Sequence, residues 1–268
     1  MKNFQVTHYS VSSGKISPES CGFTFAVISD LHSNCYGIDL HRLNREIIAA
    51  EPDAVLLTGD IFNRNYKEQP TDTLNYLVTL SKHFPVFYGI GNHEYDMKMY
   101  PEEYGYKYHT IKEYLQEAGI VFLEDETVFF EKKNNRIALT GVMIDSVFYK
   151  RNAPVMGGGL MDKHLGIADK GVFNILLAHN PDYFHHYSDW GADLVLSGHL
   201  HGGTIRIPGK GGLLSPRFRL FPEYDGGLYK YRNSTMIVSR GMGSHTVKLR
   251  INNDPELIIL KVLAKNDL

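Results

Sequence analysis

The segment FTFAVISDLH, residues 23–32, runs from an apolar, β-branched stretch directly into an acidic residue and a histidine. A short continuous apolar run of this kind is typical of a strand that is buried on both faces. Two later segments repeat the arrangement, DAVLLTGD at 53–60 and FPVFYGIGNHE at 84–94. The repetition predicts three buried strands, at 23–29, 53–59 and 84–90.

The residues between these strands predict helices. In IDLHRLNREIIAAEP, residues 38–52, apolar side chains recur every three or four positions, which is typical of an amphipathic helix that ends before Pro52. TDTLNYLVTLSKH, residues 71–83, predicts a second helix with Thr71 as its candidate N-cap. The order strand, helix, strand, helix, strand favours a parallel sheet with helices on its faces.

The rest of the chain continues the alternation of strand-like and helix-like segments. The tyrosine-rich segment 94–119 predicts a helix in its second half, and 120–144 predicts three short antiparallel strands with a hairpin turn at 132–135. Further elements are a short helix at 181–188 and strands near 172–179, 192–199, 226–231, 234–239 and 256–263. No composition break marks a linker, so we expect one α/β domain over residues 1–268.

Composition and charge exclude several classes of protein. The chain has 268 residues and a formal net charge of −2, so it lacks the basic excess typical of nucleic-acid-binding proteins. Its two cysteines, Cys21 and Cys35, fit neither a CxxC motif nor a disulfide framework and are expected to be free thiols. The N-terminus has no apolar core of a signal peptide and no run approaches 18 apolar residues, so we expect a cytoplasmic protein without a transmembrane helix.

The polar residues at the strand ends share one chemistry. They are Asp30, His32, Asp60, Asn92, His93, His179, His199 and His201. Because ligands of open α/β sheets bind at the carboxyl ends of the strands, we expect these side chains to meet at one edge. Oxygen and imidazole donors without a thiolate suit Mn, Fe, Co, Ni or Zn and exclude Cu(I) and iron–sulfur clusters. As many as seven ligands are too many for one ion, whereas two ions that share a carboxylate fit the number and are typical of phosphoester hydrolases.

The residues around these positions support the metal-site interpretation. Glycine permits positive φ and a close approach of backbone or phosphate, and glycines stand beside the ligands at Gly59, Gly91, Gly198 and Gly202. Side chains at i and i+2 of an extended segment point the same way, which aligns the ligands within 30–32 and within 199–201. Leu200, between two histidines, is then expected to point back toward the core.

The five motifs and their order resemble the calcineurin-like metallophosphoesterase superfamily. The motifs are DxH at 30–32, GD at 59–60, GNHE at 91–94, a lone histidine before Asn-Pro at 179, and GHxH at 198–201. The resemblance implies a four-layer αββα sandwich, in which two mixed β-sheets are flanked by helices and a binuclear metal site lies at the C-terminal ends of the strands. The motif-bearing region is 23–243.

A narrower resemblance is to the YaeI/YkuE-like branch of bacterial phosphodiesterases. It rests on SDLHSN at 29–34, SGHLHGGTIRIP at 197–208 and FPEYDGGLYKY at 221–231, closed by SRGMG at 239–243. Some members of that branch carry a membrane anchor or an export signal. This sequence shows neither, so any membrane contact is expected to be peripheral.

The resemblance implies a role for each motif residue. The first of two divalent metal ions would be bound by Asp30, His32 and His201, the second by Asn92, His179 and His199, and Asp60 would bridge them. A hydroxide activated between the ions would attack phosphorus in line. His93 would stabilise the transition state or protonate the leaving alkoxide. Arg240 and Asn34 are candidate substrate-binding residues.

The minor candidates also have plainer interpretations. Asn34 fits loop capping better than substrate contact, and Arg240 fits a surface ion pair as well as a phosphate contact. Glu94 either orients a ligand histidine or is a solvated charge.

The motifs favour a metal-dependent phosphohydrolase, and within that class a phosphodiesterase. The alternatives are a phosphomonoesterase or protein phosphatase on the same site, a non-catalytic metal-binding scaffold, and a nuclease. A protein phosphatase would carry a GDxVDRG-like segment where this chain reads GDIFNRN at 59–65. A scaffold would have lost ligands, and none is missing, while a nuclease would show a basic groove. The phosphoester is left open between lipid-linked and nucleotide-linked compounds.

Overall fold

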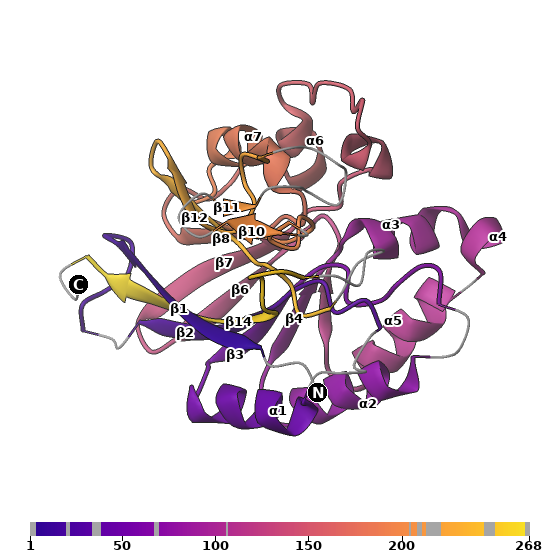
Figure 1. The fold of residues 1–268 in the computed structure, drawn as a ribbon. Coiled ribbons are helices and arrows are strands. Elements are labelled where there is room, and N and C mark those ends of the chain that lie inside the picture. The colour runs from indigo at the N-terminus through magenta and orange to yellow at the C-terminus, as the bar shows by residue number, and fades with distance from the viewer. Residues whose placement is uncertain are drawn as a thin grey trace.

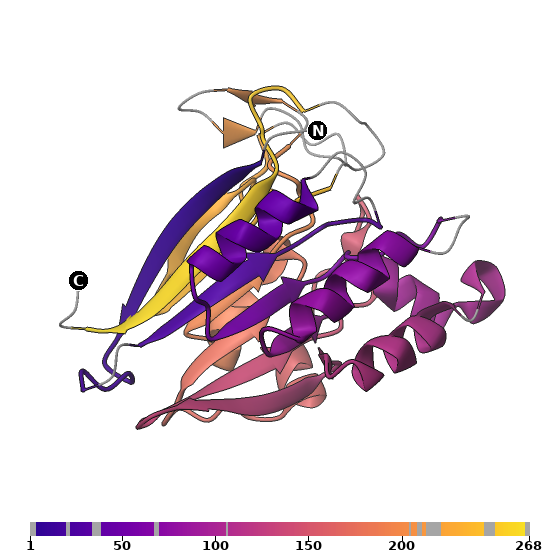
Figure 2. The same ribbon diagram turned by 90° about the horizontal axis from the view of Figure 1, so that it is seen from below.

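Two six-stranded sheets pack face to face, and helices cover their outer faces (Figure 1, Figure 2). The computed structural model describes residues 4–19, 22–33, 39–66, 70–105, 107–203, 205–207, 211–212, 221–243 and 250–265. The four layers confirm the αββα sandwich that the sequence predicted.

The first sheet has the strand order β1-β14-β2-β3-β4-β5. Its strands are β1 (Gln5–Ser13), β14 (Glu256–Ala264), β2 (Phe23–Ile28), β3 (Ala54–Thr58), β4 (Val86–Gly89) and β5 (Val121–Leu123). Strands β2 to β5 run parallel, and β14 joins them antiparallel to β2. The carboxyl ends of β2, β3 and β4 therefore meet at one edge of this sheet.

The second sheet has the strand order β12-β13-β9-β8-β7-β6. Its strands are β12 (Gly227–Tyr231), β13 (Ser234–Val238), β9 (Leu194–Ser197), β8 (Phe173–Leu177), β7 (Asn135–Gly141) and β6 (Glu126–Lys132). The four central strands are parallel, and the two outermost strands pair antiparallel with their neighbours. A small hairpin, β10 (Arg206–Ile207) with β11 (Gly211–Gly212), lies outside both sheets.

Helices flank the two sheets on opposite sides of the sandwich (Figure 1). The first sheet is covered by α1 (Leu40–Ala49), α2 (Thr71–Ser81) and α5 (Lys107–Glu117), and the second by α6 (Leu160–Leu165) and α7 (Phe184–Trp190). Four further helical elements lie in the connections: α3 (Asn92–Met99), α4 (Pro101–Tyr104), and the 3₁₀ helices η1 (Ser146–Tyr149) and η2 (Pro181–Tyr183).

The core explains why the strands read as continuous apolar runs. In β2, Phe25 and Val27 pack between the two sheets, whereas Ala26 and Ile28 pack under the helices. Both faces of such a strand are buried, so all of its positions except Thr24 are apolar.

The three strands expected in 120–144 do not form one antiparallel set. Strands β6 and β7 do form the predicted hairpin, with Lys132 paired to Asn135. Strand β5, however, pairs parallel with β4 in the first sheet. A period-2 pattern shows which residues share a face but not which partner a strand joins, so the sequence could not assign β5 to its sheet.

Several other elements also differ from the sequence prediction, and α6 and the β10–β11 hairpin are among those that were not predicted. Thr71 is the first helical residue of α2, and Pro70 occupies the cap position without a side-chain hydrogen bond. Helix α3 begins at Asn92, directly after β4, so the first half of the tyrosine-rich segment is helical as well. Strand β1 was not predicted, because it is an edge strand in which Val11 alone is fully buried.

Two points concern predictions about compartment. Within the residues that the structure describes, no helix has the length and apolar character needed to cross a membrane. Cys21 and Cys35, expected to be free thiols, lie outside the described residues.

Candidate metal centre

Five strand ends from the two sheets bring their polar residues to one place. The loops after β2 and β3 supply Asp30, His32 and Asp60, the first two residues of α3 after β4 are Asn92 and His93, and the segments after β8 and β9 supply His179, His199 and His201. All of these side chains are buried except that of His199, which is half-buried. Three groups of ligand atoms lie within 4.8 Å of one another: Asp30–His32–His201, His32–Asp60–His93 and Asp60–His179–His199.

The first group joins the loop after β2 to the loop after β9. His201 Nε2 lies 3.2 Å from Asp30 Oδ1 and 3.0 Å from His32 Nε2, and the two imidazole rings stack with centroids 4.9 Å apart. Two imidazole nitrogens and a carboxylate oxygen thus converge on one point, which is the donor set of a metal ligand group.

The group Asp60–His179–His199 joins the end of β3 to the second sheet. His179 Nε2 lies 3.1 Å from Asp60 Oδ2. His179 Nδ1 donates a hydrogen bond of 2.7 Å to the carbonyl oxygen of Thr58, which fixes the ring orientation and directs Nε2 at the site. Asp60 also belongs to the group with His32 and His93, so its carboxylate stands between the two ends of the site.

The backbone at these residues adopts a conformation that side chains rarely take. Positive φ angles occur at five of the seven candidate ligands: Asp30 at 52°, His32 at 56°, Asp60 at 52°, His199 at 72° and His201 at 51°. Such left-handed residues cost free energy and collect at functional sites. The expectation that 30–32 and 199–201 are extended was therefore wrong, and the left-handed turns aim these side chains instead.

Close packing explains two of the glycines. A Cβ on Gly198 would lie 2.0 Å from Ser29 Oγ and 2.3 Å from Asp30 Oδ2, and one on Gly91 would lie 2.3 Å from the backbone nitrogen of Asp60. Only glycine leaves room for the ligand loops to come this close.

The charges of the site suit bound cations. Burial raises the pKa of Asp30 to about 6, since an isolated carboxylate is costly in a dry environment. Burial alone would lower the pKa of His179, but the carboxylates of Asp60 and Asp30 raise it to about 10. For Asp60, burial is opposed by the imidazoles of His179 and His93, which hold its pKa well below the ordinary value. The two buried carboxylates thus favour positive charge beside them.

An unpartnered oxygen points to the same conclusion. Asn92 Oδ1 is buried and has no hydrogen-bond partner within the described part of the chain. A buried amide oxygen without a partner is costly, and a metal ion would satisfy it. The seven residues therefore fit two divalent ions chemically.

The family assignment follows from comparison with known proteins. The sequence model of the calcineurin-like phosphoesterases matches residues 23–203. The chain belongs to this family. The match covers the loops after β2, β3, β4, β8 and β9, which together supply the whole candidate metal centre.

Three relatives align with most of this phosphoesterase. YkuE of Bacillus subtilis (strain 168), an uncharacterized metallophosphoesterase, is 25% identical over 265 residues, covering 98% of this chain and 86% of YkuE. The phosphodiesterase YaeI of Escherichia coli (strain K12) is 28% identical over 244 residues, covering 90% and 82%. LpxG of Chlamydia trachomatis, a UDP-2,3-diacylglucosamine pyrophosphatase, is 26% identical over 282 residues, covering 90% and 84%. The protein is thus a metal-dependent hydrolase of phosphoesters, and the narrower resemblance to YkuE and YaeI is confirmed.

Glu94 in the phosphoesterase GNHE motif holds backbone rather than a ligand histidine. Its carboxylate accepts hydrogen bonds from the backbone N–H groups of Asp60 at 2.9 Å, Phe62 at 2.9 Å and Gly91 at 3.1 Å, and from the hydroxyl of Tyr88 at 2.8 Å. Glu94 is 1% exposed, so it is not a solvated charge. It therefore locks the loop after β3 to the start of α3.

His93 is held in one tautomer by the neighbouring loop. Its Nδ1 accepts a hydrogen bond of 3.1 Å from the backbone N–H of Arg64, so a neutral ring carries its proton on Nε2. Nε2 lies 3.8 Å from Asp60 Oδ2 and faces the metal centre. The arrangement leaves a proton donor pointing into the site.

The two candidate substrate-binding residues have different outcomes. Asn34 lies outside the described residues. Arg240 follows β13, and its Nη2 makes an ion pair of 2.8 Å with Glu256 Oε1, which is 1% exposed. Arg240 thus makes an ion pair, but with a buried partner rather than at the surface as expected, and its contact with substrate stays a prediction.

Sequence reasoning missed C-terminal residues that hold the last ligand loop. Asn253 Nδ2 donates hydrogen bonds of 2.6 Å to the carbonyl oxygens of His201 and Gly203. Arg250 contacts His201 Nδ1 at 3.3 Å and donates to the carbonyl oxygen of Gly241 at 3.2 Å. Neither residue stands in a motif, and both follow His201 by about fifty positions, so no local pattern marks them.

Proposed function

We propose that this phosphoesterase is a phosphodiesterase with a binuclear metal centre. Asp30, His32 and His201 would hold one ion, and Asn92, His179 and His199 the other, with Asp60 bridging them. The observation that carries the proposal is the position of Asp60, whose carboxylate belongs to two of the three ligand groups at once. Mn, Fe, Zn, Co and Ni all suit this donor set.

The chain's own residues would each contribute one part of the chemistry. Two bound divalent ions would supply a nucleophile from water and neutralise charge on the phosphoryl group. As water replaces the leaving oxygen at phosphorus, His93 would donate its Nε2 proton to that oxygen, so that an alcohol departs. The Arg64 backbone N–H keeps the proton on Nε2, and Glu94 holds the loops that carry Asp60 and His93.

The nearby arginines favour a diester over a monoester. Arg64 pairs with Asp96 and Arg240 pairs with Glu256, so a carboxylate already balances the charge of each guanidinium group. A monoester dianion brings one more negative charge than a diester anion, and these two guanidinium groups are less able to offset it. The similarity to the phosphodiesterase YaeI supports the same substrate class.

The test is an activity panel on metal-reconstituted protein. We expect kcat/KM for bis-p-nitrophenyl phosphate to exceed that for p-nitrophenyl phosphate by about tenfold or more. Comparing kcat/KM for lipid diesters with that for nucleotide diesters then identifies the class of the native substrate. A preference for the monoester would overturn the phosphodiesterase assignment. Full metal content without turnover of any ester would instead support a non-catalytic scaffold.

A further inference from the structure

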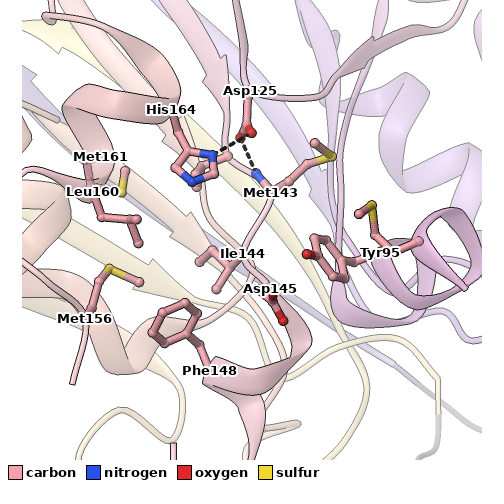
Figure 3. Close-up of a pocket in the computed structure, with 12 residues that line it drawn as sticks. Tyr95, Asp125, Met143, Ile144, Asp145, Phe148, Met156, Leu160, Met161 and His164 are labelled. Atoms are coloured by element: carbon pink, nitrogen blue, oxygen red, sulfur yellow. Dashed lines mark hydrogen bonds and ion pairs between the residues drawn. The ribbon is translucent and has the colours of Figure 1, made fainter. Parts of the chain in front are cut away.

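An apolar pocket opens between helix α3, the segment that follows β7, and helix α6 (Figure 3). Its volume is about 340 Å³, within the range of roughly 300–1,000 Å³ that is usual for small-molecule sites. None of its lining residues belongs to the candidate metal centre. The phosphoryl chemistry proposed above therefore leaves this pocket without a role.

Two elements connect the pocket to the metal centre. On α3, Asn92 and Tyr95 are three positions apart and share one face of the helix, and Tyr95 lines the pocket. In η1, Phe148 lines the pocket, and the next residue, Tyr149, packs edge-on against His199 with ring centroids 4.8 Å apart. Helix α3 thus carries residues of both the pocket and the metal centre, and η1 carries one residue that lines the pocket and one that contacts a candidate ligand.

The lining is apolar and adaptable. Four of the chain's eight methionines line the pocket, Met99, Met143, Met156 and Met161. Aliphatic and aromatic side chains, including Ile144, Phe148 and Leu160, complete the wall (Figure 3). Unbranched methionine side chains adjust to flexible apolar ligands, so this lining suits a group without a fixed shape.

The polar groups of the pocket are engaged by the protein. Asp125 Oδ2 lies 2.9 Å from His164 Nδ1, and its Oδ1 accepts the backbone N–H of Met143 at 2.7 Å (Figure 3). The Tyr95 hydroxyl is hydrogen-bonded to the Asp145 side chain. A nucleobase or a sugar would need polar side chains of the pocket as hydrogen-bond partners, but the side chains of Asp125, His164, Tyr95 and Asp145 already bond to one another. A hydrocarbon chain needs no such partner.

We propose that this pocket binds an alkyl or acyl chain carried by the phosphodiester substrate. The proposal rests on the phosphodiesterase function and adds the chemical class of the substrate. Removing the chain from water would strengthen binding while the phosphorus lies at the metal centre.

The first experiment varies the chain on a simple diester. Manganese-loaded protein is given methyl p-nitrophenyl phosphate and octyl p-nitrophenyl phosphate, below the concentration at which the octyl ester aggregates. We expect kcat/KM to be at least about tenfold higher for the octyl ester, since two buried methylene groups already contribute that factor. Equal values would overturn the pocket assignment while leaving the phosphodiesterase intact, and cleavage of neither ester would refute the phosphodiesterase itself.

The second experiment fills the pocket and needs no turnover. Leu160→Trp places a large side chain in the pocket, and Leu165→Trp is the matched control, because Leu165 is a half-buried leucine of the same helix that does not line the pocket. Calorimetry on the metal-loaded proteins compares octyl phosphate with methyl phosphate. We expect wild type and Leu165→Trp to bind octyl phosphate at least about tenfold more tightly, and Leu160→Trp to lose that preference.

Two outcomes would contradict the assignment by calorimetry. One is equal affinity of wild type for the two phosphates, and the other is a preference that survives in Leu160→Trp. If that variant does not fold, Met99→Trp serves the same purpose from α3, because Met99 also lines the pocket and is 49% exposed.

Discussion

At the level of single residues, the Asp60 carboxylate ties three loops together. Its Oδ1 accepts the His93 backbone N–H at 2.8 Å, and its Oδ2 lies 3.1 Å from His179 Nε2 and 3.8 Å from His93 Nε2. The loops after β3, β4 and β8 therefore meet on one side chain. His93 stands beside it with Nδ1 held by the Arg64 backbone N–H, so under the proposed mechanism metal binding and proton transfer would fall to different residues.

His93→Ala separates these two roles. We expect the variant to keep its full metal content, because none of the seven candidate ligands is changed, while turnover of bis-p-nitrophenyl phosphate falls by about 10²- to 10⁴-fold. Elemental analysis and steady-state kinetics measure the two quantities. His41→Ala, at an exposed histidine on α1, is the control and should match wild type in both. Unchanged turnover in His93→Ala would show that His93 is not the acid.

At the level of elements, the ligand loops depend on how closely the strand ends approach. Gly198→Ala would push a Cβ to 2.0 Å from Ser29 Oγ, so the loops after β2 and β9 must separate. We expect a loss of about 1–3 kcal/mol in the free energy of unfolding, together with weaker metal binding. Thermal unfolding and metal titration measure these effects.

The matched control for Gly198→Ala is Gly157→Ala. Nothing lies within 4 Å of the Cβ that Gly157 would gain. The melting temperature of the Gly157→Ala variant should therefore equal that of wild type or be slightly higher. Equal stability and equal metal affinity of Gly198→Ala and Gly157→Ala would refute the close-packing account.

A second cluster joins α3, α5 and the end of β5 through Glu124. Burial alone would raise the pKa of Glu124, but hydrogen bonds from Lys112, Lys98 and Tyr108 hold it below the ordinary value of 4.5. A lowered pKa means that the ionised carboxylate stabilises the folded state above pH 4.5, and that this contribution is lost as the pH falls through the folded pKa. The cluster fixes the helix whose first residue is Asn92.

Glu124→Gln tests this contribution through its pH dependence. At pH 7 we expect the variant to lose about 1–2 kcal/mol, or roughly 2–8 °C in melting temperature. The difference from wild type should shrink as the pH falls below the ordinary value of 4.5 and through the lowered folded pKa. Glu131→Gln is the control, since the Glu131 carboxylate is 68% exposed, and its melting temperature should follow wild type throughout. A difference that is independent of pH would show that charge is not the cause.

Most helices and strands could be predicted from the sequence, because the strands are buried on both faces or the helices show a strongly periodic apolar pattern. The apolar runs of β2, β3, β8 and β9 are unmistakable, since both faces of each strand are covered. Strand β1 escaped prediction because its side chains are mostly half-exposed at the sheet edge. The partner of β5 escaped because pairing depends on tertiary contacts that a local pattern does not contain.

At the level of the whole molecule, the sandwich turns ligands that are distant in sequence into one site. His201 lies 169 residues from His32, yet their Nε2 atoms are 3.0 Å apart. The sequence could name these ligands because each follows a recognisable strand. It could not show that they stand in left-handed turns, that Glu94 holds backbone, or that Asn253 holds the His201 loop. The single-domain organisation over 1–268 stays a prediction.

Anomalous diffraction from crystals of the manganese-loaded protein tests the central claim most directly. We predict two peaks roughly 3.5–4 Å apart on either side of the Asp60 carboxylate. One peak should contact Asp30, His32 and His201, and the other Asn92, His179 and His199. A single peak at full metal loading, or two peaks that do not share Asp60, would contradict the binuclear account.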